Sequence, residues 1–148
     1  MNKKLLPLSL LSAADETAIE GITRFQKLVF LAQREELDEE LYPFKAGKYG
    51  PFSKTLYVDI DRLVQKGFIS QSTQSTSSSG NDEKQVYELT EKGKTVIKNG
   101  LSADEESLSS EQLCTFVDEY NDMELWDLLE YVYETYPKMA ENSKLDLI

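Results

Sequence analysis

Paired carboxylates are the side chains of this sequence whose spacing could support catalysis. Asp59 and Asp61 are separated by a single residue, and Asp118 is followed directly by Glu119. Two carboxyl groups that face one pocket can act as general acid and general base, as they do in glycoside hydrolysis. Neighbouring acids on helices more often form solvated faces, so we expect no catalytic site in this chain.

Other catalytic and metal-binding arrangements are excluded by composition. The chain has no histidine and one cysteine, Cys114, and it lacks the GxxxxGK[ST] and GxGxxG phosphate-binding loops. Ser-His-Asp and Cys-His nucleophiles, histidine-ligated metals and cysteine clusters therefore cannot form. We expect a non-enzymatic protein without cofactor or metal. A single cysteine cannot form an internal disulfide, which fits a reducing cytoplasm, and Cys114 is expected to be a small core residue.

Charge is unevenly distributed along the 148 residues, whose net charge is −11. Residues 1–100 hold 14 acidic and 14 basic side chains, whereas residues 101–148 hold 13 acidic and 2 basic ones. We therefore divide the chain into a neutral domain, 1–100, and an acidic helical extension, 101–148, which packs on the core or forms a dimer interface. Such acidity repels phosphate and attracts basic protein surfaces over about 8 Å, although a solubilising helical face is the alternative.

A turn, a helix and a strand are predicted between Phe44 and Ile69. Gly50 and Pro51 favour the turn, and Ser53 is placed to cap the helix that follows. Gly67 stands where a glycine commonly ends a helix. The exposed face of this helix is predicted to carry Lys54, Val58, Asp61, Arg62 and Gln65.

The remaining pattern predicts an α+β, mostly helical fold: a winged helix-turn-helix core with a two-stranded wing and a C-terminal helical extension. No segment is long enough to span a membrane. The expected elements are a helix over 4–14, a helix opened by a capping box at Thr23–Gln26, strands over 68–73 and 85–89, a helix capped by Thr90 that ends near Asn99, a helix opened by a capping box at 109–112, and a last helix capped by Asn121 or Asp122 and ended by Pro137.

The acidic extension carries a candidate protein interface. Aromatic side chains lie beside acids there, off the apolar stripe formed by Leu125, Leu128, Leu129, Val132 and Tyr136. Tyrosine and tryptophan are enriched in protein interfaces, although the rings could instead be buried on the core or on a second copy of the chain. The candidate interface residues are Asp118, Glu119, Asp122, Glu124, Trp126, Tyr131 and Tyr133.

DNA binding is the alternative interpretation of the winged-helix pattern. Against it stand a core without net charge, a wing whose tip has one cation, and the acids Asp59 and Asp61 in the helix that would read the duplex. The candidate DNA contacts are Ser53, Lys54, Tyr57, Arg62, Lys84, Lys92 and Lys94.

Two cations at the start of the second helix are placed unfavourably for the helix dipole. We expect Arg24 and Lys27 to pair with acids of the C-terminal third. Lys48 and Tyr49 flank the glycine turn, and holding that turn is the simplest role for them.

Three segments support a resemblance over roughly residues 20–145. ITRFQKLVFLAQ, KAGKYGPFSKTLYVDIDRLVQKGFI and YELTEKGK resemble an uncharacterised prokaryotic winged-helix family and the related Panacea domain, whose members act as antitoxins. This resemblance implies an antitoxin that neutralises a toxin by direct protein contact. The acidity of the chain favours, more broadly, a regulatory protein that contacts a basic partner as an antitoxin, an adaptor or an anti-repressor. The family pattern marks Gln26, Lys27, Lys48, Tyr49, Gly50, Pro51 and Phe52.

Overall fold

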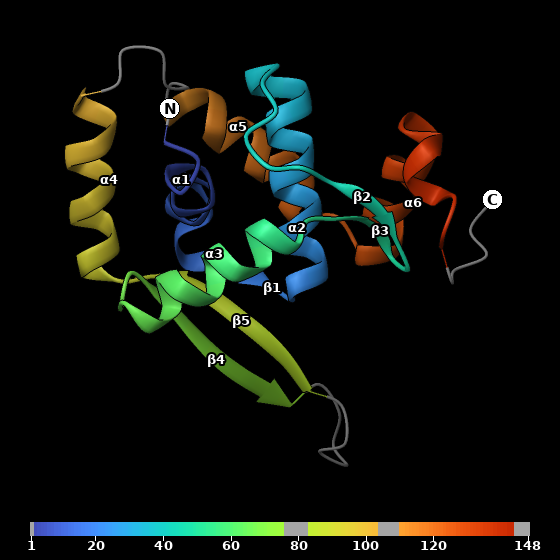
Figure 1. Cartoon of the computed structure of the whole chain (residues 1–148). Helices are drawn as coiled ribbons and strands as arrows, with labels where there is room; N and C mark the ends of the chain where they lie inside the picture. The colour runs from blue at the N-terminus through green and yellow to red at the C-terminus, as the bar shows by residue number, and fades with distance from the viewer. Residues whose placement is uncertain (1, 76–82, 104–109, 144–148) are drawn as a thin grey trace.

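The computed structural model describes residues 2–75, 83–103 and 110–143, which form the predicted α+β, mostly helical fold (Figure 1). The α-helices are α1 (Leu5–Ala14), α2 (Ile22–Leu31), α3 (Lys54–Gln65), α4 (Glu91–Ala103), α5 (Ser110–Asn121) and α6 (Leu125–Thr135). The strands are β1 (Ile19–Glu20), β2 (Lys45–Gly47), β3 (Gly50–Phe52), β4 (Ile69–Ser75) and β5 (Glu83–Leu89). Two 3-10 turns, η1 (Asp15–Thr17) and η3 (Pro137–Ala140), and a π-helical turn, η2 (Ala32–Leu37), complete these elements.

The larger sheet is antiparallel, with strand order β1-β5-β4. Its β4–β5 ladder runs from Ile69 opposite Leu89 to Ser75 opposite Glu83, so the predicted hairpin is present. The hairpin projects away from the helices (Figure 1). Strand β1 was not predicted, because two residues are too short to show an alternating pattern. The short β2–β3 hairpin formed by the glycine-proline turn was not predicted either.

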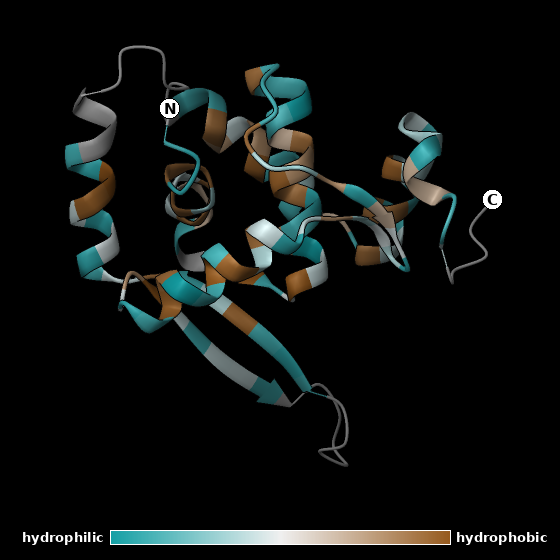
Figure 2. Ribbon diagram, in the orientation of Figure 1, coloured by the Kyte–Doolittle hydropathy of each residue, from teal (hydrophilic) through white to brown (hydrophobic). Residues whose placement is uncertain are grey.

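The hydrophobic core is centred on α1 and α2. Leu6 of α1 and Phe25 and Phe30 of α2 are at most 1% exposed, and α1 is mostly apolar in colour in Figure 2. The acidic extension packs on this same core, since Phe116 of α5 and Val132 of α6 belong to the same cluster. Helix α2 is buried on several sides, as its nearly continuous apolar sequence predicts.

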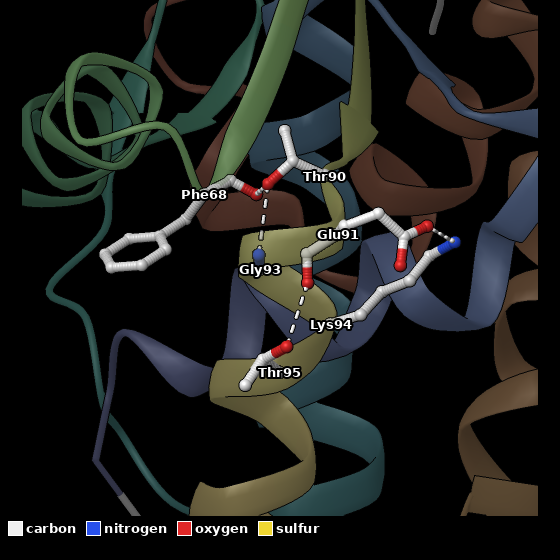
Figure 3. Close-up of polar contacts among 6 residues, drawn as sticks. All are labelled: Phe68, Thr90, Glu91, Gly93, Lys94 and Thr95. Atoms are coloured by element: carbon white, nitrogen blue, oxygen red, sulfur yellow. Dashed lines mark hydrogen bonds and ion pairs between the residues drawn. The ribbon is translucent and has the colours of Figure 1, made fainter.

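Local signals place the ends of α3 and the start of α4 as predicted. The Ser53 hydroxyl accepts a hydrogen bond from the Leu56 amide (3.2 Å), and Gly67 follows the helix with φ of +83°. Thr90 accepts from the Gly93 amide (3.0 Å) and thereby caps α4 (Figure 3). Helix α4 does not end near Asn99, however, but continues to Ala103.

The capping box predicted at Thr23–Gln26 is wrong. Helix α2 begins at Ile22, after Gly21 at the N-cap with φ of +88°, and no side chain caps it. The amide of Gln26 is used elsewhere: it donates to the Ser53 carbonyl (3.0 Å) and accepts from the Ser53 amide (2.9 Å). A contact 27 residues away in sequence thus replaces the local one.

One carboxylate joins the π-helical turn η2 to the acidic extension. Glu35 accepts hydrogen bonds from the hydroxyls of Tyr120 (2.7 Å), Tyr131 (2.7 Å) and Tyr136 (3.1 Å). We call these four residues the Glu35 cluster. Burial and the neighbouring carboxylate raise the pKa of Tyr120, so its hydroxyl stays protonated and donates at neutral pH. The cluster positions α5 and α6 against α2.

The ends of the extension differ in part from prediction. Neither Asn121 nor Asp122 caps α6; its N-cap is Glu124, because the Asn121 side chain instead donates to the Ala18 carbonyl (2.8 Å). Helix α6 ends before Pro137, as predicted. The capping box predicted at 109–112 lies partly outside the described residues.

Two apolar side chains predicted for buried positions are solvent-accessible. Cys114 is exposed rather than a core residue, since α5 turns Leu113, Phe116 and Val117 towards the core instead. Leu125 of the predicted α6 stripe is 37% exposed, at the first turn of that helix. Within the described ranges, no helix is both long and apolar enough to cross a membrane.

Candidate functional site

A cavity lies where β1 and α2 meet the α5–α6 connection. Its volume is about 560 Å³, and four exposed carboxylates stand around it. Glu20 comes from β1, Asp118 from α5, and Asp122 and Glu124 from the connection. We call these four residues and the cavity they surround the acidic cavity. Segments about 100 residues apart in sequence therefore combine to give one region of negative charge.

Arg24 is the basic residue that lines the acidic cavity. It is half-buried, and its Nη1 donates to the Asn121 carbonyl (3.2 Å). Burial lowers the pKa of Arg24, while the carboxylates of Glu20 and Glu124 act in the opposite direction. The predicted link from Arg24 to the C-terminal third exists, but it runs through a backbone carbonyl. Outside the cavity, Lys84 pairs with Glu20 at 2.8 Å.

Four lining carboxylates against one guanidinium leave the acidic cavity with a net negative charge. The carboxylates that line the cavity can accept hydrogen bonds from guanidinium or ammonium groups of an incoming chain. Arg24 links α2 to the end of α5 through its bond to the Asn121 carbonyl. Across the described ranges, no group of three or more acidic or cysteine side chains is arranged to hold a metal ion. Glu20 was not among the predicted site residues, since its neighbours in space cannot be read from its neighbours in sequence.

The predicted interface residues divide into exposed and buried ones. Trp126 is 57% exposed and follows Leu125, next to the acidic cavity residue Glu124. Glu119 is exposed but does not line the cavity. Tyr131 is half-buried in the Glu35 cluster, and Tyr133 is 1% exposed, so for these two rings the structure agrees with the alternative of burial on the core. Their rings face the core because α6 packs against α2 and β3.

The candidate DNA contacts are likewise brought together only in part. Lys54, Tyr57 and Arg62 are exposed on α3, whereas Ser53 is 1% exposed and is used as the helix cap. Each remaining lysine already has a partner: Lys84 pairs with Glu20, Lys94 with Glu91 (3.2 Å; Figure 3), and Lys92 donates to the Lys66 carbonyl (2.8 Å).

Asp59 does not face outwards, although the sequence suggested that it would repel DNA from the surface of α3. It is 5% exposed and accepts a hydrogen bond from the Tyr42 hydroxyl (2.9 Å). Burial, together with this carboxylate, raises the pKa of Tyr42. A small hollow of about 140 Å³ beside Asp59 is bordered by Lys4, Arg62 and Lys66. The end of α3 is consequently more basic than the sequence of that helix suggests.

A third surface surrounds the β2–β3 turn, whose residues were marked by the resemblance. Gln26 and Lys27 of α2 face this turn, and the Lys27 Nζ donates to the Pro51 carbonyl (3.0 Å). Lys27 is 2% exposed, and burial lowers its pKa to about 7. The predicted pairing of Lys27 with an acid is not seen among the described residues, because none of their carboxylates lines its cavity.

The family-pattern residues thus gather in one place. The cavity at the turn has a volume of about 390 Å³, and we call it the Lys27 cavity. Tyr49 and Phe52 are 50% and 42% exposed at its rim. The residues of the pattern that line it are Gln26, Lys27, Lys48, Tyr49, Gly50 and Phe52.

Comparison with known proteins adds no relative, since neither a protein-family profile nor a curated protein sequence matches this chain.

Proposed function

We propose that this chain is a non-enzymatic regulatory protein that binds a basic segment of another protein in the acidic cavity. The observation that carries the proposal is the convergence of Glu20, Asp118, Asp122 and Glu124 around one cavity of about 560 Å³. Complementary charge speeds association with a basic partner and disfavours acidic ones. Leu125 and Trp126, which follow Glu124 in sequence, are exposed apolar side chains, and aromatic side chains such as Trp126 commonly act as anchors in interfaces.

The frame that we propose for this activity is a winged helix-turn-helix. Helices α2 and α3, with the β4–β5 hairpin after α3, follow the order of that motif. The acidic extension is packed beside this frame, where its charge serves a partner that is basic. Antitoxin, adaptor and anti-repressor are the roles that such a contact would serve, and the resemblance to the Panacea domain favours the first.

A charge-matched comparison tests the acidic cavity. The triple variant Asp118→Asn, Asp122→Asn, Glu124→Gln removes three carboxylates from the cavity. The control triple variant Asp38→Asn, Glu39→Gln, Glu40→Gln removes the same charge from exposed positions that do not line it. Binding of a fluorescein-labelled tetra-arginine peptide, measured by anisotropy at low salt, reports on both variants.

The cavity variant should bind the peptide about tenfold more weakly than the unmodified protein, at about 0.4 kcal/mol for each exposed pair. The control variant should lose about twofold or less, because its carboxylates contribute only long-range attraction. Equal losses in the two variants would show that the peptide senses net charge alone, and the cavity would then not be the contact.

DNA binding is the second candidate, and the basic border of the hollow at the end of α3 favours it. Lys4, Arg62 and Lys66 line that hollow, and Lys92 lies against Lys66. Binding of random genomic duplex fragments at low salt, followed by anisotropy, tests this function, since phosphate contacts are strongest there. Binding that falls steeply with added salt and weakens in Arg62→Ala would support it. No binding even at low salt would exclude it.

A further inference from the structure

We propose that the Lys27 cavity binds a small carboxylate ligand with an apolar body, whose carboxylate pairs with the Lys27 amine. This inference goes beyond the proposed protein contact, because it concerns a different cavity and a different class of ligand.

The cavity has the size and lining of a small-molecule site. Its volume of about 390 Å³ falls within the range of about 300–1,000 Å³ that is usual for ligand pockets. Helix α2 forms one wall with Ile22, Gln26 and Lys27, and the β2–β3 turn forms the other with Gly47, Tyr49 and Phe52. Mostly apolar walls with few polar groups suit a ligand that has one charged end.

Lys27 supplies the polar group that would orient this ligand. An ammonium has three N–H donors, and the described structure gives one of them an acceptor, the Pro51 carbonyl at 3.0 Å. The amine therefore retains donors for a carboxylate oxygen. At 2% exposure these donors are largely removed from bulk water. The attraction between opposite charges is stronger in such a buried environment than at the surface.

Three side chains from two other elements face this amine or the backbone next to it. Lys48 and Tyr49 come from the β2–β3 turn and line the same cavity. Tyr133 comes from α6 and packs against Gly50, where an added Cβ would stand 3.0 Å from its ring and 3.3 Å from the Lys27 Cε. None of the three is a carboxylate, and no carboxylate of the described residues lines this cavity, so among these residues a protonated Lys27 has no acid to compete with a bound carboxylate.

The cost of burying this lysine argues against a purely structural role. A buried ammonium without a carboxylate is destabilising, and methionine would fill a similar volume without charge. A single hydrogen bond to the Pro51 carbonyl stabilises the protein by less than the burial of the ammonium destabilises it. A bound carboxylate would compensate the charge, and its apolar body would cover the exposed rings of Tyr49 and Phe52.

A pair of probes that differ only in their charged end tests the proposal. Octanoate and octanol share one apolar body, and calorimetric titration into the full chain compares their affinities. We expect octanoate to bind at least about tenfold more tightly than octanol, as is usual for a hydrogen bond between charged groups. Equal affinity of the two probes, or no octanoate binding at millimolar concentration, would overturn the proposal.

The pH dependence identifies the amine without any substitution. Since octanoate would pair with protonated Lys27, whose pKa in the free protein is about 7, its affinity should fall as pH rises. The expected loss is about sevenfold from about pH 6 to about pH 8.5, because a neutral Lys27 leaves only the affinity of the apolar body, about tenfold weaker. Octanol affinity should stay constant, and an octanoate affinity that is equally constant would refute the role of Lys27.

Two lysine variants locate the site. Lys27→Met should reduce octanoate affinity to that of octanol, whereas Lys94→Met on α4, which does not line the cavity, should leave it unchanged. Equal loss in both variants would indicate a non-specific charge effect and count against the site. Tetra-arginine binding should persist in Lys27→Met, so the failure of one proposal is distinguishable from the failure of the other.

Discussion

Replacing Lys27 by methionine should change how the stability of the protein depends on pH. Burial lowers the pKa of this amine from 10.5 to about 7. Because the unfolded chain retains the ordinary value, it binds more protons than the folded chain between about pH 7 and about pH 10.5. Stability of the unmodified protein should therefore rise with pH in that window, by about 1.36 kcal/mol per unit.

The size of the effect follows from the two pKa values. Below about pH 7 both states carry the proton and the penalty for the buried ammonium is fully present. Above about pH 10.5 both states are neutral and the penalty is lost. From about pH 6 to about pH 9 the contribution of Lys27 amounts to about 2.7 kcal/mol. Lys27→Met lacks this contribution of the buried amine. Its free energy of unfolding should therefore exceed that of the unmodified protein most at low pH, and the difference should shrink by about 2.7 kcal/mol from about pH 6 to about pH 9.

Urea denaturation followed by far-ultraviolet circular dichroism measures this difference. The free energies of unfolding of the unmodified protein and Lys27→Met are compared from about pH 6 to about pH 9 at constant ionic strength, with Lys94→Met as the control for losing an exposed lysine. Other titrating groups are common to all three proteins and cancel in the differences. Parallel stability profiles for the unmodified protein and Lys27→Met would refute the assignment of a buried amine with a lowered pKa.

Two further predictions concern contacts that hold the fold. Glu35→Ala removes the common acceptor of the Glu35 cluster and should cost about 1–2 kcal/mol in urea denaturation, whereas Glu35→Gln keeps one acceptor oxygen and should cost less. An unchanged urea midpoint in Glu35→Ala would show that the carboxylate is not the link. Tyr42→Phe leaves the buried Asp59 carboxylate without its hydroxyl donor and should cost about 1–3 kcal/mol by the same assay. The further substitution Asp59→Asn should recover part of this loss of stability. An unchanged urea midpoint in Tyr42→Phe would contradict the contact.

Much of the fold could be predicted because its signals are local. Ser53 and Thr90 cap the helices that follow them, since a hydroxyl reaches an amide three residues on without help from the rest of the chain. Gly67 could be placed for a similar reason, because positive φ is a property of the residue itself. The hairpin strands β4 and β5 were also found from the sequence, at nearly the observed bounds.

The candidate site could be predicted only in part. Asp118, Asp122 and Glu124 were marked by the acidity of their segment, which is a compositional signal. Glu20 and Arg24 complete the acidic cavity from a segment about 100 residues earlier, and only the packing of α5 and α6 against α1 and α2 brings them there. Exposure and burial of Tyr131 and Tyr133 both stayed open, because helix periodicity does not say which other element covers a face.

The sequence by itself determined the kinds of chemistry open to this protein, its charge distribution and the local ends of its helices. The tertiary structure decided the partners of its polar groups. It placed the Gln26 amide on Ser53 instead of in a capping box, buried Asp59 against Tyr42, and enclosed Lys27 in a cavity that no carboxylate of the described residues lines. Such pairings depend on contacts between residues far apart in sequence, and a buried polar group takes whichever partner the packed chain brings within hydrogen-bonding distance.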